Sequence, residues 1–198
     1  MTGMRLARRS RKRGALDKAL GLARARAARL ASSPPLPPRA PADPHAAARV
    51  RSGAGPVLVV SCDASEGRGY EALEEARAAA PHVLLLALDL FVDEAQIRRA
   101  RQAGADGVVL VARVLPQDRL AELAAAARAQ GLSVSVEVRS APELAGALAI
   151  QADAVRVAEM DRDNGRPDPD AAATRAAAEK AHVAIVDTAS KAADKDAP

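Results

Sequence analysis

The chain has 198 residues, enough for one domain of ordinary size with a tail. Nearly half of the residues are hydrophobic, so a real core can form, but aromatic residues make up only 1%, which excludes an aromatic platform for stacking bases. The single cysteine excludes a disulfide framework within the chain, and three widely spaced histidines leave little material for a zinc site, so we expect no metal. No apolar run is long enough to span a bilayer and no segment resembles a secretory signal, so we expect a cytoplasmic protein without a membrane partner.

Charge divides the chain into two parts. Residues 1–51 carry 13 Lys and Arg against two Asp, a balance of +11, whereas the remainder has a balance of −7. We interpret residues 1–52 as a basic Arg- and Ala-rich arm with a Pro-rich linker, residues 53–190 as the folded domain and residues 191–198 as a disordered tail. The arm is either a solvated tail or a surface that contacts nucleic acid or an acidic partner.

Within this arm, Leu16, Leu20 and Ala23 fall at helical spacing, so residues 15–31 can form a helix. Residues 32–44 hold six prolines, a composition typical of an extended, semi-rigid linker.

From residue 55 onward the chain repeats one pattern, in which a short Val-rich apolar run precedes an Ala-rich helical stretch. The runs start 21 to 29 residues apart, the length of a strand plus a crossover helix, which implies parallel strands. The predicted strands are 56–61, 83–88, 107–112, 133–138, 154–158 and 183–187. The predicted helices lie near 68–80, 93–103, 117–130, 141–150 and 169–181.

Six such units could form an open doubly wound or receiver-like sheet, or part of a barrel that needs about 250 residues when complete. Residues 133–138 favour the barrel, because their three valines share one face while Ser133, Ser135 and Glu137 share the other. A strand in an open α/β sheet would be apolar on both faces. We therefore predict an α/β fold, a TIM-barrel-like (β/α) repeat of about six strand–helix units in an incomplete barrel. Glu137 would lie at the carboxyl end of its strand, where barrels place their chemistry.

Three stretches carry a family resemblance. Residues 88–97 read Leu-Asp-Leu-Phe-Val-Asp-Glu-Ala-Gln-Ile, residues 103–107 read Ala-Gly-Ala-Asp-Gly, and residues 131–138 hold Gly-Leu followed by Val-Glu-Val. Together, over residues 83–160, they resemble indole-3-glycerol phosphate synthase. The resemblance implies a TIM-barrel lyase of tryptophan biosynthesis, which closes an indole ring on an anthranilate-derived ribulose phosphate with loss of carbon dioxide and water. It also implies that no metal or organic cofactor is needed.

The resemblance further implies two acid lysines and several strand-end glutamates. In this chain the general-acid lysine is replaced by Leu88, and a first-strand Glu and Lys fall on Leu58 and Val60. The Val-Glu-Val glutamate is retained as Glu137, which we expect to lie among these three aliphatic residues without a cationic neighbour. The family's second strand, its eighth strand and the associated phosphate contacts have no evident counterpart.

We expect Glu137 and Asp187 as catalytic residues and Asp89 and Thr188 as substrate-binding residues. Purely structural roles are the alternatives: Glu137 would be a solvated strand-end carboxylate, Asp89 a loop residue and Asp187 a strand terminus.

Three functions stay open. The first is a catalytically impaired relative, a pseudoenzyme, because both acid lysines are replaced. The second is a working but divergent enzyme that uses Glu137 on a small phosphorylated substrate. The third is a scaffold or binding module whose basic arm contacts nucleic acid or an acidic protein. An incomplete barrel also leaves open sheet edges, so we expect self-association.

Overall fold

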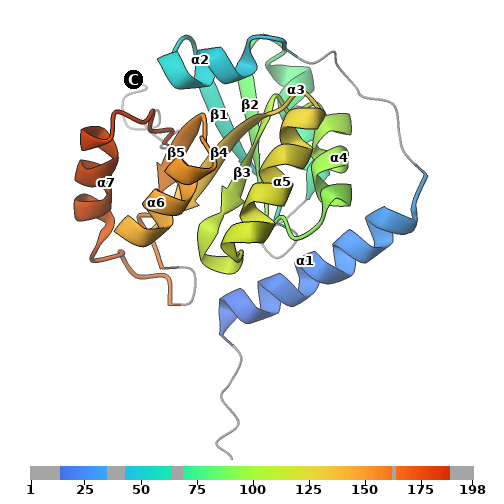
Figure 1. The fold of residues 1–198 in the computed structure, drawn as a ribbon. Helices are drawn as coiled ribbons and strands as arrows, with labels where there is room; N and C mark the ends of the chain where they lie inside the picture. The colour runs from blue at the N-terminus through green and yellow to red at the C-terminus, as the bar shows by residue number, and fades with distance from the viewer. Residues whose placement is uncertain (1–13, 35–42, 64–68, 162–163, 188–198) are drawn as a thin grey trace, which may run out of the picture.

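The computed structural model of this chain describes residues 14–34, 43–63, 69–161 and 164–187 (Figure 1). The strands are β1 Val57–Ser61, β2 Leu84–Leu88, β3 Gly107–Val111, β4 Ser133–Val138 and β5 Ala154–Val157. The helices are α1 Ala15–Ser32, α2 Ala46–Ser52, α3 Tyr70–Ala79, α4 Glu94–Gln102, α5 Gln117–Ala129, α6 Ala141–Ala149 and α7 Ala171–Lys180, with a short 3₁₀ turn at Ala112–Val114. None of the described helices combines the length and apolarity needed to cross a bilayer.

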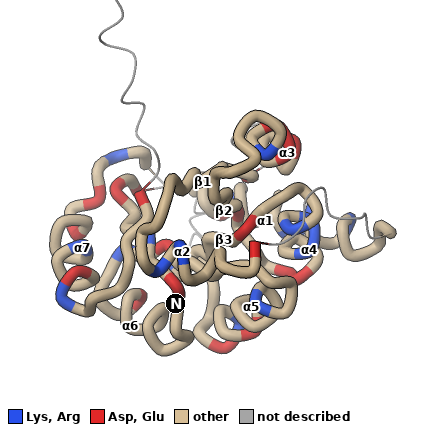
Figure 2. Tube along the Cα trace, turned by 90° about the horizontal axis from the view of Figure 1, so that it is seen from above, with Lys and Arg blue, Asp and Glu red and all other residues tan. Residues whose placement is uncertain are grey.

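The order of the strands decides the fold class. All five are parallel and neighbour one another in the order β1-β2-β3-β4-β5. A doubly wound sheet reverses its strand order at a switch point, whereas a barrel adds each strand beside the previous one. Seen from above, α3 to α7 follow one another around the strands in chain order (Figure 2). The prediction of an incomplete TIM-barrel-like repeat is therefore confirmed, and the doubly wound and receiver-like alternatives are wrong.

Two hydrophobic clusters lie on the two sides of the curled sheet. The outer cluster packs the strands on their helices, with Leu85, Val108 and Val136 among its strand residues. The inner cluster lines the concave face and includes Leu86 and Val109. Alternation along β4 gives its valines to the outer cluster, as predicted, which leaves Ser133, Ser135 and Glu137 facing the interior.

The sixth predicted strand is limited to a single parallel bridge, between Ile185 and Val155 of β5. The Val155 amide donates to the carbonyl of Ala184 at 2.8 Å, and the Val186 amide donates to the carbonyl of Val155 at 2.9 Å. Within the described residues no further strand continues the sheet beyond this point, so segment 183–187 lacks a second neighbour to extend its pairing.

Two strands are each preceded by a buried aspartate that fixes where the strand starts. Asp106, directly before β3, accepts the Leu85 amide at 3.0 Å and pairs with Arg77. Asp153, directly before β5, accepts the Val134 amide at 2.9 Å and pairs with Arg51 of α2. Each buried carboxylate thus takes a backbone hydrogen bond from the neighbouring strand, which sets the strands in register and satisfies groups that would otherwise be buried unpaired.

The predicted helix over residues 15–31 is confirmed as α1, and it lies against the barrel together with α2. The two helices close opposite ends of the strands (Figure 1). Ala23 of α1 and Val50 of α2 are both buried in the inner cluster. Residues within the segment interpreted as arm and linker therefore contribute to the core.

Candidate functional site

The interior polar group at the carboxyl ends of the strands is an ion pair. Glu137, at the end of β4, lies opposite Arg156 of β5 in the register of the sheet. The side chain of Glu137 is 4% exposed, and its Oε2 accepts from Nη1 of Arg156. The expectation that Glu137 would have no cationic neighbour was therefore wrong. The sequence contained the information needed to predict this pair, because position 156, which lies beside Glu137 on the next strand, carries arginine.

Two buried polar atoms beside this pair have no hydrogen-bond partner among the described residues. They are the hydroxyl of Ser135, a residue with no exposed surface, and Nε of Arg156. A buried polar atom left unpaired costs free energy, so such atoms favour a bound water or a polar ligand.

The positions of the family's two lysines and first-strand glutamate divide between the two faces of the sheet. Leu88 belongs to the inner cluster, so its position faces the interior. Leu58 and Val60 pack against the outer cluster instead. The expectation that they would surround Glu137 was wrong, because alternation along β1 sends both side chains towards the helices.

Asp89, expected to bind substrate, is held by donors from three helices. Its Oδ2 accepts from Oη of Tyr70 at 2.8 Å, Nη1 of Arg26 at 3.1 Å and Nε2 of Gln96 at 3.2 Å. Its Oδ1 accepts the Leu90 amide at 2.8 Å. Burial raises the pKa of Asp89, while Arg26 and the hydrogen bond from Tyr70 act in the opposite direction. Sequence reasoning missed these partners because they lie far away along the chain.

Asp187, expected to be catalytic, lies at the end of segment 183–187 with its side chain 63% exposed. It accepts from Nη2 of Arg175 on α7 at 2.7 Å. Glu137 and Asp187 therefore have different cationic partners on different elements. Thr188 lies outside the described residues.

A second charge network borders the mouth of the barrel, meaning the space at the carboxyl ends of the strands. Nε of Arg139, directly after β4, donates to Asp168 at 2.6 Å, and its Nη2 donates to Asp161 at 3.4 Å. Arg113 pairs with Asp161 at 3.6 Å. Burial would lower the pKa of Arg139, but the Asp168 carboxylate outweighs burial and raises it. These arginines are committed to acidic partners and do not form an uncompensated anion site.

Helix α1 closes the mouth. Leu16 of α1 lines a pocket together with Val111, Glu137 and Met160, and the cavity there measures about 10 Å³. That is close to the space one water molecule needs, whereas cavities that hold small-molecule ligands measure about 300–1,000 Å³.

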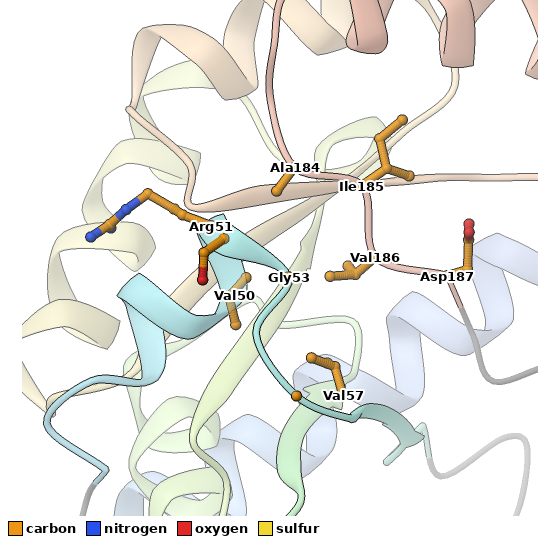
Figure 3. Close-up of a pocket in the computed structure, with 10 residues that line it drawn as sticks. Val50, Arg51, Gly53, Val57, Ala184, Ile185, Val186 and Asp187 are labelled. Atoms are coloured by element: carbon orange, nitrogen blue, oxygen red, sulfur yellow. The ribbon is translucent and has the colours of Figure 1, made fainter.

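A larger cavity of about 390 Å³ lies on the open side of the barrel. It is bordered by the start of β1, the end of α2 and residues 184–187. Val57, Ala184 and Val186 gather along this opening, whereas the ends of the Arg51 and Asp187 side chains point away from it (Figure 3). Its lining thus combines aliphatic side chains with the polar residues Arg51, Ser52 and Asp187. No group of three potential metal-ligating side chains gathers in the part of the chain that the structure describes.

The curated proteins that resemble this chain share one name. Indole-3-glycerol phosphate synthase 2 of Ralstonia nicotianae is 32% identical over 111 residues, covering 56% of this chain and 41% of the relative. The Streptomyces coelicolor protein of the same name is 39% identical over 109 residues, covering 55% and 42%. Indole-3-glycerol phosphate synthase of Albidiferax ferrireducens is 42% identical over 79 residues, covering 40% and 30%. This chain spans less than half the length of these relatives.

Among solved structures, a 3-hexulose-6-phosphate synthase superposes with a TM-score of 0.54 at 20% identity, covering 73% of this chain and 74% of that one. This similarity supports the fold alone. A model of one protein family matches residues 31–164, about two thirds of the chain, and the family it describes is indole-3-glycerol phosphate synthase. By that match the chain belongs to the indole-3-glycerol phosphate synthase family.

Proposed function

We propose that this chain binds a small polar ligand of the sugar-phosphate class at the barrel mouth without performing the lyase reaction of its family. It would then act through binding, as a pseudoenzyme. The observation that carries the proposal is the buried Glu137–Arg156 pair, beside unpaired polar atoms of Ser135 and Arg156 and an aliphatic residue at the general-acid position.

Loss of the reaction is supported by Leu88. A general acid must hold a proton that it can release near neutral pH, and an alkyl side chain has none. The positions on the interior face of β1 do not replace it, since Val57 and Val59 are aliphatic and the Ser61 hydroxyl does not release its proton near neutral pH. The Oε2 atom of Glu137 is engaged by Arg156, so use of this oxygen as a base would require breaking that contact.

Retention of binding is supported by the unpaired polar atoms. The hydroxyl of Ser135 and Nε of Arg156 offer hydrogen bonds beside the aliphatic residues of the inner cluster. A few placed polar groups in an apolar wall are typical of small-molecule sites. The Glu137 carboxylate opposes a purely anionic ligand at this point, which favours contact with hydroxyl groups of the ligand over contact with its phosphate.

The test uses the full chain and the family's anthranilate-derived ribulose phosphate. Calorimetry should detect saturable binding, while indole fluorescence in the same sample stays at background. Arg156→Met should weaken binding by at least about tenfold, the scale of one lost hydrogen bond to a charged group. The control Arg98→Met removes an exposed arginine of α4 and should bind like the parent. Turnover abolished by Glu137→Gln would establish the divergent enzyme instead, and the absence of binding would refute the proposal.

A second candidate is docking of nucleic acid or an acidic protein through the basic arm. Lys18, Arg24 and Arg29 are exposed on α1, which favours it. Replacing all three by Gln should then abolish binding of a duplex DNA probe or a polyglutamate probe, and parent binding should weaken steeply with salt. Equal binding by parent and variant would refute this candidate.

A further inference from the structure

We propose that α1 is a lid over the barrel mouth and that Arg26 is the latch that keeps it closed. The proposal concerns access to the mouth and does not depend on which ligand the mouth takes. It starts from what holds α1 in place.

The apolar contact between α1 and the barrel is small. Its two buried residues are Ala23 and Ala27. The partly buried Leu16, Ala19 and Leu20 pack against the inner cluster, and Leu30 packs against the outer one. An alanine side chain buries little apolar area, and hydrophobic stabilisation follows the area removed from water. The apolar face alone therefore holds α1 weakly.

Arg26 supplies the specific contact. Its Nη1 donates to the carbonyl oxygen of Cys62 at 2.5 Å and to Oδ2 of Asp89 at 3.1 Å. Its guanidinium also lies over the ring of Tyr70, 5.2 Å from the centroid. The side chain of Arg26 is only 11% exposed and that of Asp89 1%, so solvent and salt screen this pair little.

The socket for Arg26 is built by the barrel itself. Asp89 keeps the hydrogen bonds from Tyr70, Gln96 and the Leu90 amide whether or not Arg26 is present. Withdrawal of Arg26 would leave the carboxylate satisfied and open to water. A preformed socket with one removable partner suits reversible opening, in which α1 lifts while the barrel stays folded.

The closed position excludes ligands from Glu137 and Arg156. With α1 in place the cavity under Leu16 measures about 10 Å³, far below the size of a small-molecule site. Any ligand that reaches this pair must therefore select the open state, and its apparent affinity falls with the fraction of open molecules. The strength of the Arg26 latch sets that fraction.

Cys62 is a built-in reporter of opening. It is the only cysteine of the chain, it has no exposed surface, and Arg26 donates to its carbonyl oxygen. The thiol lies in the outer cluster with Tyr70, whose ring Arg26 covers. Its reaction with 5,5′-dithiobis(2-nitrobenzoate) under native conditions therefore reports openings that displace Arg26, and hydrogen exchange assigns such openings to α1. Arg26→Met should raise this rate by at least about tenfold, because it removes the charge-assisted hydrogen bonds that hold α1 to Cys62 and Asp89.

The matched control is Arg24→Met, which removes an exposed arginine two residues away on the same helix and should react like the parent. Urea unfolding of each variant separates lid opening from global unfolding. The proposal is overturned if Arg26→Met reacts at the parent rate, or if its faster reaction is fully explained by lower global stability.

Hydrogen exchange of the parent protein tests the lid without a variant. Amides of α1 should exchange through an opening that leaves β3 and β4 protected, whereas equal protection of α1 and these strands would overturn the proposal. Neither measurement uses a ligand, so failure of the lid would leave the proposed binding function untouched.

Discussion

At the residue scale, Cys62 has a chemical property that can be measured directly. Burial raises the pKa of its thiol from 9.0 to about 12, and the Asp89 carboxylate adds to the effect. The folded state holds this proton more tightly than the unfolded state, so the contribution to stability is present below pH 9 and is lost as the pH rises towards 12. Thiolate absorbance should therefore appear near the ordinary value only in urea-unfolded protein, and a midpoint near 9 in folded protein would contradict the burial of Cys62.

The Glu137–Arg156 pair gives a second prediction for single residues. Glu137→Gln leaves the arginine without its counter-charge, and Arg156 keeps 17% of its side-chain surface in solvent. We expect a loss of about 2 kcal/mol in the free energy of unfolding, between the values typical of surface pairs and of fully buried pairs. Urea denaturation measures the loss. Glu122→Gln, which removes an exposed partner of Arg119, should change stability by less than about 0.5 kcal/mol, and equal effects of the two changes would contradict the prediction.

Part of the candidate site could be predicted from the sequence. Strand alternation was enough to place Glu137 at an interior carboxyl end, because the polar face of β4 contrasts with its valines. The partners of Asp89 could not be predicted, since Arg26, Tyr70 and Gln96 come from three helices whose approach depends on the whole fold. Long-range side-chain contacts of this kind leave no periodic signal in the chain.

At the scale of elements, the packing of β3 against its neighbours depends on Gly107. A Cβ atom there would lie 2.6 Å from Cδ2 of Leu86 and 3.0 Å from the carbonyl oxygen of Ser133, and it would also collide with the Ser133 hydroxyl. Gly107→Ala should therefore lower the free energy of unfolding by about 1–3 kcal/mol, the usual range for overpacking. Adding Ser133→Ala should restore part of the loss, because it removes one of the colliding atoms.

The control for this prediction is Gly21→Ala in α1. No atom outside the local helix lies within 4 Å of a Cβ placed there. An alanine is favoured over glycine in a helix by about 0.5–1 kcal/mol, so this change should slightly stabilise the protein. If thermal unfolding finds the two variants equally stable, the close approach at Gly107 is refuted.

The elements themselves were the most predictable part of the fold. The spacing of the apolar runs predicted five of the strands and the five helices that follow them, each end within two residues of its observed position. Asp93 and Gln96 form a capping box at the start of α4. The structure of segment 183–187 could not be predicted from the spacing of the apolar runs. Its apolar composition matches a strand, but strand pairing also requires a neighbour on the far side, which composition does not report.

At the scale of the whole molecule, the sheet formed by the described residues ends at β1 on one side and at segment 183–187 on the other. Among the described residues β1 pairs only with β2, and segment 183–187 meets β5 through one bridge. Exposed edges carry unpaired amide and carbonyl groups that readily accept another chain. The cavity of about 390 Å³ lies between these two edges, and its lining offers both aliphatic and polar side chains to a partner.

We therefore expect the full chain to self-associate through the opening between β1 and segment 183–187. The mass measured by sedimentation equilibrium should rise with concentration above the 20.4 kDa of one chain. Val57→Lys places a charge at the start of β1 beside the cavity and should shift the equilibrium towards the monomer, as charged residues on edge strands do. Leu22→Lys, at an exposed position of α1, should leave it unchanged. A parent protein that stays at the mass of one chain at every concentration would show that the open edge is protected within the monomer.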